Sequence, residues 1–441
     1  MRDNDTVFAL SSAPGRAAIA VVRVSGPAAG AAVAALTGRN HVPPRQAVFA
    51  RLRDGHGAPI DEALVLWFPA PFSETGEDVA EFQTHGGRAV VEAVLAALAA
   101  VPGLKPAGPG AFTRRAVENG KFDLTGAEAL IDLIDAETEA QRRQALSQMG
   151  GALAALYDGW RARLIRASAW AEAAIDFSDE EVPEDANAGA RAALKGILKE
   201  IQAHLDDSHR GELVREGLFL TVIGQPNSGK STLVNALARR DVAIVAETAG
   251  TTRDIIEVRM DLGGYAVTLA DTAGLREAAE AIEAEGVRRA LARAEAADIV
   301  VLVLDGTAAD PFAGIPPEAR SKASLTVWNK ADLGLPQARE GLKISARTGE
   351  GIPALVEALT GLVQERLAGV REAPVLTRAR HRHELEEAAT ALARALQAPP
   401  EAPELMAEDM RLALRALGRI TGRVDVEELL DVVFRDFCIG K

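Results

Sequence analysis

The feature that most constrains the fold of this chain is the run GQPNSGKS at residues 224–231. The apolar run GLFLTVI comes directly before it, and TLVNALAR after it has the pattern of a helix. A strand, a glycine-rich loop and a helix in this order surround phosphate oxygens with backbone N–H groups and the positive end of the helix. The sequence therefore predicts a phosphate-binding α/β domain in this part of the chain.

The motifs that follow this loop predict which nucleotide is bound. GTTRD at 250–254 can supply a threonine to Mg²⁺, and DTAG at 271–274 can contact the metal and the γ-phosphate. NKAD at 329–332 offers a carboxylate that can accept two hydrogen bonds from the N1–H and amino groups of guanine, a pair that adenine lacks. SAR at 345–347 predicts a second loop against the base. We therefore predict a guanine-nucleotide site and hydrolysis of GTP.

The predicted site residues divide into phosphate, metal and base contacts. Lys230 is expected beside the β- and γ-phosphates as a catalytic residue, and Ser231 is expected to offer its hydroxyl to Mg²⁺. The full predicted GTP-binding set, in which residues 246–249 rest on the family resemblance given below, is Asn227, Ser228, Gly229, Lys230, Ser231, Thr232, Ala246, Glu247, Thr248, Ala249, Gly250, Thr251, Thr252, Asp271, Thr272, Ala273, Gly274, Asn329, Lys330, Asp332, Ser345, Ala346 and Arg347.

The residue after the DTAG motif, Leu275, bears on how GTP is hydrolysed. Small signalling GTPases have a glutamine at this point that orients the attacking water. Leucine cannot form a hydrogen bond with water, so another polar group has to act. The acidic residues that follow are the candidates: Glu277, Glu280, Glu283 and Glu285.

Composition limits the class of protein. The length of 441 residues predicts about three domains, and 48% hydrophobic with 25% charged residues is typical of soluble globular chains. The net charge of -14 argues against a protein that coats nucleic acid, although it leaves room for a local basic patch. Cys438 is the only cysteine, which excludes an intrachain disulfide and a thiolate zinc cluster. We expect no membrane span and no signal peptide, and hence a cytoplasmic location.

The patterns along the chain predict a multidomain protein that combines α/β and α domains. The first part contains predicted strands, such as AIAVVRVSG and EALVLWFP. A helical pattern then begins at Thr125, which together with Glu128 resembles a capping box, and it returns after the nucleotide domain. Because the ends of a domain usually lie close together, we predict an insertion. The predicted domains are an α+β domain at 1–121, a discontinuous helical domain at 122–215 and 373–441, and the nucleotide domain at 216–372.

Segments along nearly the whole chain carry a resemblance to a known family. They are NDTVFALSSAPGRAAIAVVRVSGP, GEDVAEFQTHGG, ENGKFDLTGAEALIDLIDA, the nucleotide motifs in their order, and the terminal FCIGK. The chain resembles the bacterial and organellar tRNA wobble-uridine modification GTPases, the MnmE/TrmE family. Ribosome-assembly GTPases share the central motifs but lack the first segment and the FCIGK tail.

The resemblance implies a fold, a reaction and partners. It implies an N-terminal domain that binds folate and dimerises, a helical domain, and an inserted Ras-like P-loop GTPase domain. With a flavin-dependent partner of the MnmG/GidA family, such a protein adds an aminomethyl or carboxymethylaminomethyl group to C5 of the wobble uridine of tRNA. The one-carbon unit would come from a tetrahydrofolate derivative, the 5-formyl or the 5,10-methylene form. Potassium-stimulated hydrolysis of GTP, a homodimer, and a heterotetramer or larger complex away from membranes are also implied.

The family's functional positions fall on particular residues of this chain. Glu283 matches the acid that orients water. Cys438 lies in the terminal segment that the family directs toward the folate pocket, so it is a candidate functional thiol, although a lone cysteine is usually a small buried apolar residue. The implied potassium ligands are Asn227, Ala246, Thr248 and Thr251, and the implied Mg²⁺ ligands are Ser231 and Thr252. The implied folate-binding residues are Arg23, Glu81, Lys121 and Lys441.

Two basic groups of residues are candidates for contact with tRNA phosphates. One is the cluster of Arg378, Arg380, His381, Arg382 and His383, and the other is the series of Arg411, Arg415, Arg419 and Arg423. The spacing of four residues places the helical members of the series on one face. Pairing of either group with acids such as Glu386 or Glu408 is an equally open alternative.

Two other functions are weighed against a tRNA-modifying enzyme. A ribosome-assembly or regulatory GTPase would be a switch without chemistry beyond hydrolysis, and the N-terminal segment and FCIGK argue against it. A dynamin-like scaffold would use nucleotide-dependent dimerisation, and the lack of an amphipathic or lipidation signal argues against that.

Overall fold

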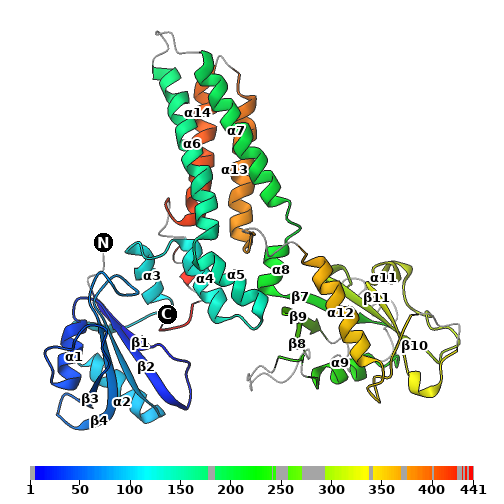
Figure 1. Ribbon diagram of the computed structural model, residues 1–441, viewed down its shortest axis with the longest axis horizontal. Helices are drawn as coiled ribbons and strands as arrows, with labels where there is room; N and C mark the ends of the chain where they lie inside the picture. Colours follow the sequence, from blue (N-terminus) through cyan, green and yellow to red (C-terminus); the bar gives the residue numbers. More distant parts are fainter. Residues whose placement is uncertain are drawn as a thin grey trace, which may run out of the picture. The chain divides into compact units, whose positions relative to one another are not determined.

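The computed structural model describes most of the chain and divides it into two compact units (Figure 1). The described residues are 5–176, 184–240, 242–244, 257–270, 294–336, 341–368, 375–399, 402–424, 430, 433–434 and 437–440. The first unit contains Met1–Ile131, Gln148–Asn187 and Ala398–Lys441, and the second contains Asp132–Ser147 and Ala188–Gln397. Each unit thus joins segments that are far apart in the sequence. None of the helices in the described ranges has an apolar stretch long enough to cross a bilayer.

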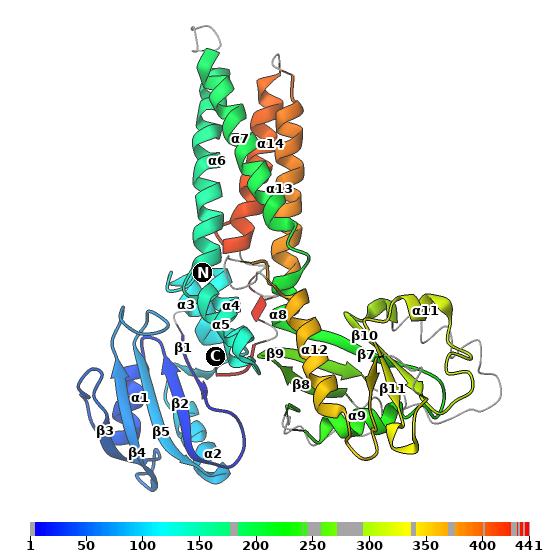
Figure 2. The same cartoon turned by 45° about the vertical axis from the view of Figure 1, so that its right-hand side comes forward.

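A six-stranded sheet with two helices forms the N-terminal part of the first unit (Figure 2). The elements are β1 (Thr6–Leu10), β2 (Ala17–Ser25), α1 (Ala29–Thr37), β3 (Val48–Arg53), β4 (Pro59–Phe68), β5 (Val79–Gly86), α2 (Arg88–Ala99) and β6 (Leu104–Pro106). The strand order is β3-β4-β5-β2-β1-β6, and the pairs are antiparallel apart from β1 with β6. Alternate residues of β2, Val22 and Val24, pack with α1 and α2 in one core, so Arg23 between them points to the other face.

The remainder of the first unit is helical. Its elements are α3 (Ala111–Glu118), α4 (Leu124–Ile134), α6 (Ala152–Asp176) and α14 (Pro403–Thr421). α6 and α14 lie side by side in Figures 1 and 2, and Arg411 pairs with Glu172 while Arg423 pairs with Asp158. Because the lower-numbered arginine meets the higher-numbered acid, the two helices are antiparallel. The predicted helical pattern is confirmed, and it comprises several helices rather than one.

The predicted capping box at the start of α4 is wrong in detail. The side chain of Asp123 accepts hydrogen bonds from the N–H of Gly126 at 2.7 Å and from the hydroxyl of Thr125 at 2.8 Å. Asp123 therefore caps the helix, and Thr125 lies inside it. Glu128, the other half of the expected box, is buried at 3% exposure.

The second unit contains a mostly parallel sheet covered on both faces. Its elements are α5 (Glu139–Met149), α7 (Glu184–Leu205), α8 (Arg210–Glu216), β7 (Leu218–Ile223), α9 (Lys230–Ala238), β8 (Glu257–Leu262), β9 (Tyr265–Ala270), β10 (Ile299–Asp305), α11 (Pro317–Ser321), β11 (Leu325–Asn329), η1 (Ala331–Leu333), β12 (Leu342–Lys343), α12 (Ile352–Arg366) and α13 (Ala379–Gln397). The strand order is β12-β11-β10-β7-β9-β8, and β8 alone runs antiparallel to its neighbour. In β10, Val301 and Val303 face the core with α9 and α12, whereas Val300 and Leu302 face the core with α11. A strand buried on both faces explains the unbroken apolar run IVVLVL.

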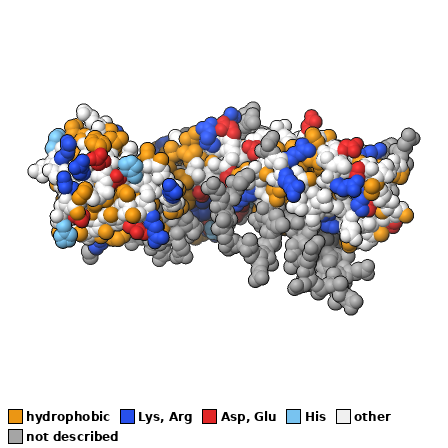
Figure 3. All heavy atoms as spheres, turned by 90° about the horizontal axis from the view of Figure 1, so that it is seen from below, with side chains coloured by type: hydrophobic (Ala, Val, Ile, Leu, Met, Phe, Trp, Pro, Cys, Tyr) orange, Lys and Arg blue, Asp and Glu red, His pale blue; other side chains and the backbone are white. Residues whose placement is uncertain are grey.

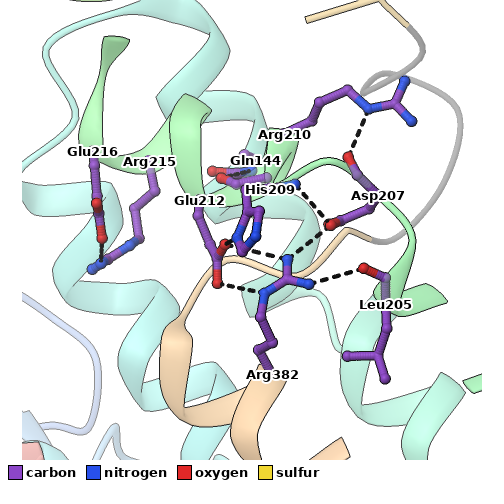
Figure 4. Close-up of polar contacts among 10 residues, drawn as sticks. Gln144, Leu205, Asp207, His209, Arg210, Glu212, Arg215, Glu216 and Arg382 are labelled. Atoms are coloured by element: carbon purple, nitrogen blue, oxygen red, sulfur yellow. Dashed lines mark hydrogen bonds and ion pairs between the residues drawn. The ribbon is translucent and has the colours of Figure 1, made fainter. Parts of the chain in front are cut away.

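Arg382 of α13 holds together the segment that leads into β7 (Figure 4). Its guanidinium donates to Asp207 at 2.8 Å, to Glu212 at 3.2 Å, and to the carbonyl of Leu205 at the end of α7 at 2.9 Å. Its side chain is 12% exposed, and the two acids are about equally buried. Nearby, burial lowers the pKa of His204 to about 4, so this ring is neutral at pH 7. The arginine therefore joins three consecutive pieces of chain in a largely dry environment.

This network decides between the two interpretations of the first basic cluster. Arg382 pairs with acids, and Arg378 pairs with Asp132 at 2.6 Å. Arg380 contacts the ring of His381. For Arg378 and Arg382, the structure therefore favours pairing with acids inside the protein. A contact of these two arginines with RNA is not supported.

Replacing Arg382 with glutamine is expected to destabilise the second unit. Asp207 and Glu212 would lose their cation while buried, which costs about 3 kcal/mol. Arg411→Gln is the matched control, because Arg411 also bridges two acids but is 54% exposed; it is expected to cost no more than about 1 kcal/mol. Urea unfolding followed by circular dichroism measures both. If the two variants lost equal amounts of stability, the network around Arg382 would not stabilise the fold as described.

Candidate functional site

The topology of the second unit places the predicted nucleotide motifs at one edge of the sheet. β7, β10 and β11 are parallel neighbours, so their carboxyl ends lie together. β7 ends at the GQPNSGKS loop, β10 ends at Asp305, and β11 ends at Asn329. Ligands of open α/β sheets bind outside the carboxyl ends of the strands. The site is therefore built from loops that follow adjacent strands.

The backbone of the 224–229 loop has the shape that phosphate binding requires. Gly229 has a φ of 94° and Asn227 a φ of 63°, both in the left-handed region that glycine and asparagine tolerate. A Cβ on Gly229 would fall on the side-chain nitrogen of Asn329, and one on Gly224 would fall on the carbonyl oxygen of Val303. The loop can lie this close to its neighbours because glycine stands at both positions, and its shape fits a polyphosphate.

Lys230 begins α9 and folds back over the loop. Its ammonium donates to the carbonyl of Gly224 at 3.0 Å and to that of Gln225 at 2.7 Å. A cation held above a loop of backbone N–H groups, at the amino end of a helix, suits the charge of phosphate oxygens. Ser231 follows in the first turn of the same helix, with Thr232 next to it. The structure thus brings together the predicted phosphate-binding residues of this loop.

Asn329 joins the phosphate loop to the base loop. Its amide nitrogen donates to the carbonyl of Ser228 at 2.8 Å, and its amide oxygen accepts from the N–H of Ala346 at 2.9 Å. The residue is 3% exposed, so both hydrogen bonds are shielded from water. One side chain therefore fixes the distance between the loop for the phosphates and the loop for the base.

Asp332 is held as an ionised acceptor at the base end of the site. One carboxylate oxygen accepts from the hydroxyl of Ser345 at 2.6 Å, and the other accepts from the guanidinium of Arg347. The hydrogen bond from Ser345, followed by that from Arg347, lowers the pKa of Asp332. An ionised carboxylate is the form that can accept from both the N1–H and the amino group of guanine. The order of the motifs and this geometry agree on guanine.

Asp305 and Gln225 contact the site, but they were not among the site residues predicted from the sequence. Although burial opposes ionisation, hydrogen bonds from Lys330 and Thr307 lower the pKa of Asp305, and its oxygen lies 2.6 Å from the ammonium of Lys330. Gln225 donates to the carbonyls of Asp310 and Ala313 at 3.0 and 2.8 Å. An acid that ends a buried strand next to the NKAD strand is the signal that could have identified Asp305.

Several predicted positions lie outside the described residues. They include Glu283, Leu275, the DTAG residues Asp271, Thr272, Ala273 and Gly274, and the loop residues Ala246, Glu247, Thr248, Ala249, Gly250, Thr251 and Thr252. Lys441 also lies outside them. Of the predicted potassium and Mg²⁺ ligands, the structure describes Asn227 and Ser231. Their assignment to these metals stays a prediction.

A second polar site lies in the first unit. Arg23 of β2 is the cross-strand partner of Glu81 of β5, and their side chains meet at 2.9 Å. The same guanidinium pairs with Glu74 at 2.5 Å and lies over the ring of Phe112, 5.7 Å from its centroid. Lys121 donates to the carbonyl of Pro71. Glu74 and Pro71 belong to the loop between β4 and β5, so this loop links the three predicted folate-binding residues that are described.

The loop between β4 and β5 also carries polar residues that the sequence prediction missed. The hydroxyl of Ser25 lies 2.7 Å from that of Thr75 and donates to Glu77 at 2.8 Å. Arg115 of α3 donates to the same Glu77 oxygen at 2.8 Å. Both hydroxyl residues are fully buried. This network holds the loop against β2 and α3, beside Arg23.

The C-terminal segment contacts the start of α3, the helix whose Phe112 lies against Arg23. Ser11 donates to the carbonyl of Gly440 at 2.9 Å, and the N–H of Gly110 donates to the carbonyl of Cys438 at 3.3 Å. Phe434 and Phe437 pack into a core with Leu124. Cys438 itself is exposed, so the alternative of a small buried apolar residue does not describe it.

A phosphate loop joined through Asn329 to a base loop with an ionised aspartate defines a P-loop protein of the guanine-nucleotide class. Comparison with known proteins agrees with this class over the whole chain. The family model described as the MnmE helical domain matches residues 124–438, and that of the GTP-binding protein TrmE N-terminus matches residues 6–121.

Three relatives described as tRNA modification GTPase MnmE match almost the full length of both chains. The protein of Parvibaculum lavamentivorans is 59% identical, that of Paramagnetospirillum magneticum 52%, and that of Caulobacter vibrioides 52%; each match covers 99% of this chain and 100% of the relative. The chain belongs to the tRNA modification GTPase MnmE family, which confirms the resemblance and the predicted fold class.

Replacing Gly229 with alanine is expected to weaken GDP binding by more than about 10-fold, which corresponds to about 1.4 kcal/mol. The left-handed backbone costs an L-residue about 1–2 kcal/mol, and the new methyl group would displace the amide of Asn329. Gly361→Ala is the control, since this glycine of α12 has open space around it. Calorimetry with GDP compares the two variants. If Gly229→Ala bound GDP with unchanged affinity, the close packing of Gly229 against Asn329 would not be needed for binding.

Proposed function

We propose that this chain hydrolyses GTP within a tRNA modification complex that adds an aminomethyl or carboxymethylaminomethyl group to C5 of wobble uridine. The observation that carries the proposal is the buried Asn329 amide, which joins the phosphate loop to the SAR loop, and this second loop holds the carboxylate of Asp332. Membership of the MnmE family over the full chain supports the tRNA substrate. The match of residues 6–121 to the TrmE N-terminus favours this function over a ribosome-assembly or regulatory switch.

The nucleotide domain would act by placing charge around the γ-phosphate. Lys230 balances the negative charge of the β- and γ-phosphates, Asp332 and Asn329 fix the base, and Glu283 orients the attacking water in place of the missing glutamine. Water attacks phosphorus, and the bond to the bridging oxygen of GDP breaks. Ser231 and Thr252 would hold Mg²⁺, and Asn227 with Ala246, Thr248 and Thr251 would hold K⁺. Such cations neutralise charge that develops on the phosphates.

The first unit would bind the one-carbon donor, a 5-formyl or 5,10-methylene tetrahydrofolate. Arg23 and Lys121 supply cations and Glu81 supplies a carboxylate, which suit the glutamate tail and the pterin edge of folate. Support comes from the loop between β4 and β5, which contacts Arg23 and Lys121. The C-terminal segment contacts the start of α3, whose Phe112 lies against Arg23, which is consistent with roles for Cys438 and Lys441.

The working assembly would be a homodimer with a flavin-dependent partner of the MnmG/GidA family, as a heterotetramer or larger complex in the cytoplasm. GTP turnover would drive a conformational cycle in this complex. The potassium site would act when two nucleotide domains meet.

The first test compares GTP turnover in potassium and sodium buffers. Potassium is expected to raise the rate on the order of 10²-fold, since loss of one preorganised group that stabilises transition-state charge costs about that much. In the Asn227→Ala variant the two rates should converge. Equal rates for the unaltered protein would reject the cation mechanism and leave the family assignment intact.

The second test analyses tRNA by mass spectrometry from cells that lack this chain. The C5 group of the wobble uridine should be absent, and it should return with the unaltered gene but not with Gly229→Ala, in which the phosphate loop is distorted. Normally modified tRNA in the deletion strain would defeat the proposed function.

A further inference from the structure

The surface of the antiparallel pair α6 and α14 has an unusual distribution of charge. Its two cross-helix ion pairs, Arg411 with Glu172 and Arg423 with Asp158, mark the ends of a strip about 20 Å long, since the acids are 14 residues apart on one helix. Between these ends the sequence has five arginines and no acid: Arg161, Arg163, Arg166, Arg415 and Arg419. We name residues 159–171 of α6 with 412–422 of α14 the arginine strip.

This concentration of one sign contrasts with the rest of the protein. The chain has a net charge of -14. On the face shown in Figure 3, basic and acidic side chains lie interspersed among apolar ones. Of these arginines, Arg166 and Arg415 are exposed. The strip therefore carries exposed positive charge on an acidic protein.

Two of these arginines are available to a ligand. Arg166 and Arg415 are exposed, and within the described ranges neither guanidinium contacts a carboxylate. By contrast, Arg411 and Arg423, at the ends of the strip, are paired with acids. Arg166 on α6 and Arg415 on α14 thus lie between the two ion pairs that mark the ends of the strip.

Exposed apolar side chains accompany the free cations. Trp170 is 57% exposed and lies one helical turn after Arg166, so the two share a face of α6. Ile165, midway between Asp158 and Glu172, is 42% exposed. Guanidinium groups that bind phosphates beside an aromatic ring on which a base stacks are the features that recognise unpaired nucleotides. An acidic protein surface would use the arginines but would not need the exposed tryptophan.

We propose that the arginine strip is the surface on which this chain binds RNA, with Arg166 and Arg415 on backbone phosphates and Trp170 against an unpaired base. The inference rests on the proposed function and names the contact that this function needs. From the second basic series of the sequence it uses Arg415, since Arg411 and Arg423 pair with acids. In the first cluster, Arg378 and Arg382 are taken up by internal ion pairs.

The test measures binding of the full chain to an unmodified tRNA transcript with a wobble uridine, by fluorescence anisotropy over a range of salt concentrations. For Arg166→Gln with Arg415→Gln, the slope of log affinity against log salt should become flatter by about 2, and the affinity should fall about 10-fold. Trp170→Leu should also weaken binding about 10-fold but should leave the salt slope unchanged, because stacking releases no counterions.

Control variants distinguish an effect of lost positive charge from an effect of a damaged fold. Arg166→Lys with Arg415→Lys keeps both charges and should keep the slope. Arg88→Gln removes an arginine of α2 that is 90% exposed and lies outside the strip, and it should bind tRNA normally. Circular dichroism and melting temperature of every variant should match the unaltered protein.

Each remaining outcome overturns the inference in a distinguishable way. If the glutamine variant keeps its affinity and slope while the unaltered chain binds tRNA, the strip is not the RNA surface and the proposed function stands. If this variant binds tRNA normally but no longer binds the flavin-dependent partner, the strip is a protein-docking surface. If the unaltered chain binds no tRNA, alone or with that partner, the inference and the proposed function fail together.

Discussion

The nucleotide site depends on the two hydrogen bonds of the Asn329 amide. Its nitrogen and oxygen are used at once, one by the phosphate loop and one by the SAR loop, and no water competes for them. Loss of this side chain would leave the carbonyl of Ser228 and the N–H of Ala346 buried without partners, at a cost of about 1–3 kcal/mol each. A single amide therefore couples recognition of the base to the shape of the phosphate loop.

The free-energy cost of an unpaired charge differs between Arg382 and Arg415 because their burial differs. Arg382 lies in low dielectric between Asp207 and Glu212, where an unpaired charge would be costly, and its task is structural. Arg415 is exposed on α14, where a charge without a carboxylate partner among the described residues costs little. The cost of an unpaired charge therefore explains why Arg382 needs its two acids, whereas Arg415 can be left open to a ligand.

Features with a short-range cause could be predicted from the sequence, and contacts between distant segments could not. The phosphate loop, Asp332 and the strand buried on both faces follow from spacing and period. The capping residue was misplaced by two positions, because Asp123 and Thr125 offer the same chemistry to the first turn. Arg382 lies 175 positions from Asp207, and this pair leaves no local pattern. Asp305 bonds to Lys330 across two strands, and its only sequence signal is its place at the end of a buried strand next to the NKAD strand.

The close approach of Gly211 to Leu376 has a consequence for the modular construction of the protein. A Cβ on this glycine would fall on the carbonyl oxygen of Leu376, so the backbone of α8, just before β7, touches the backbone that follows α12. Because the two ends of the intervening segment meet, its length can change without altering the distance between the residues on either side. The segment between Gly211 and Leu376 is therefore a place where the second unit could tolerate insertion or exchange of chain.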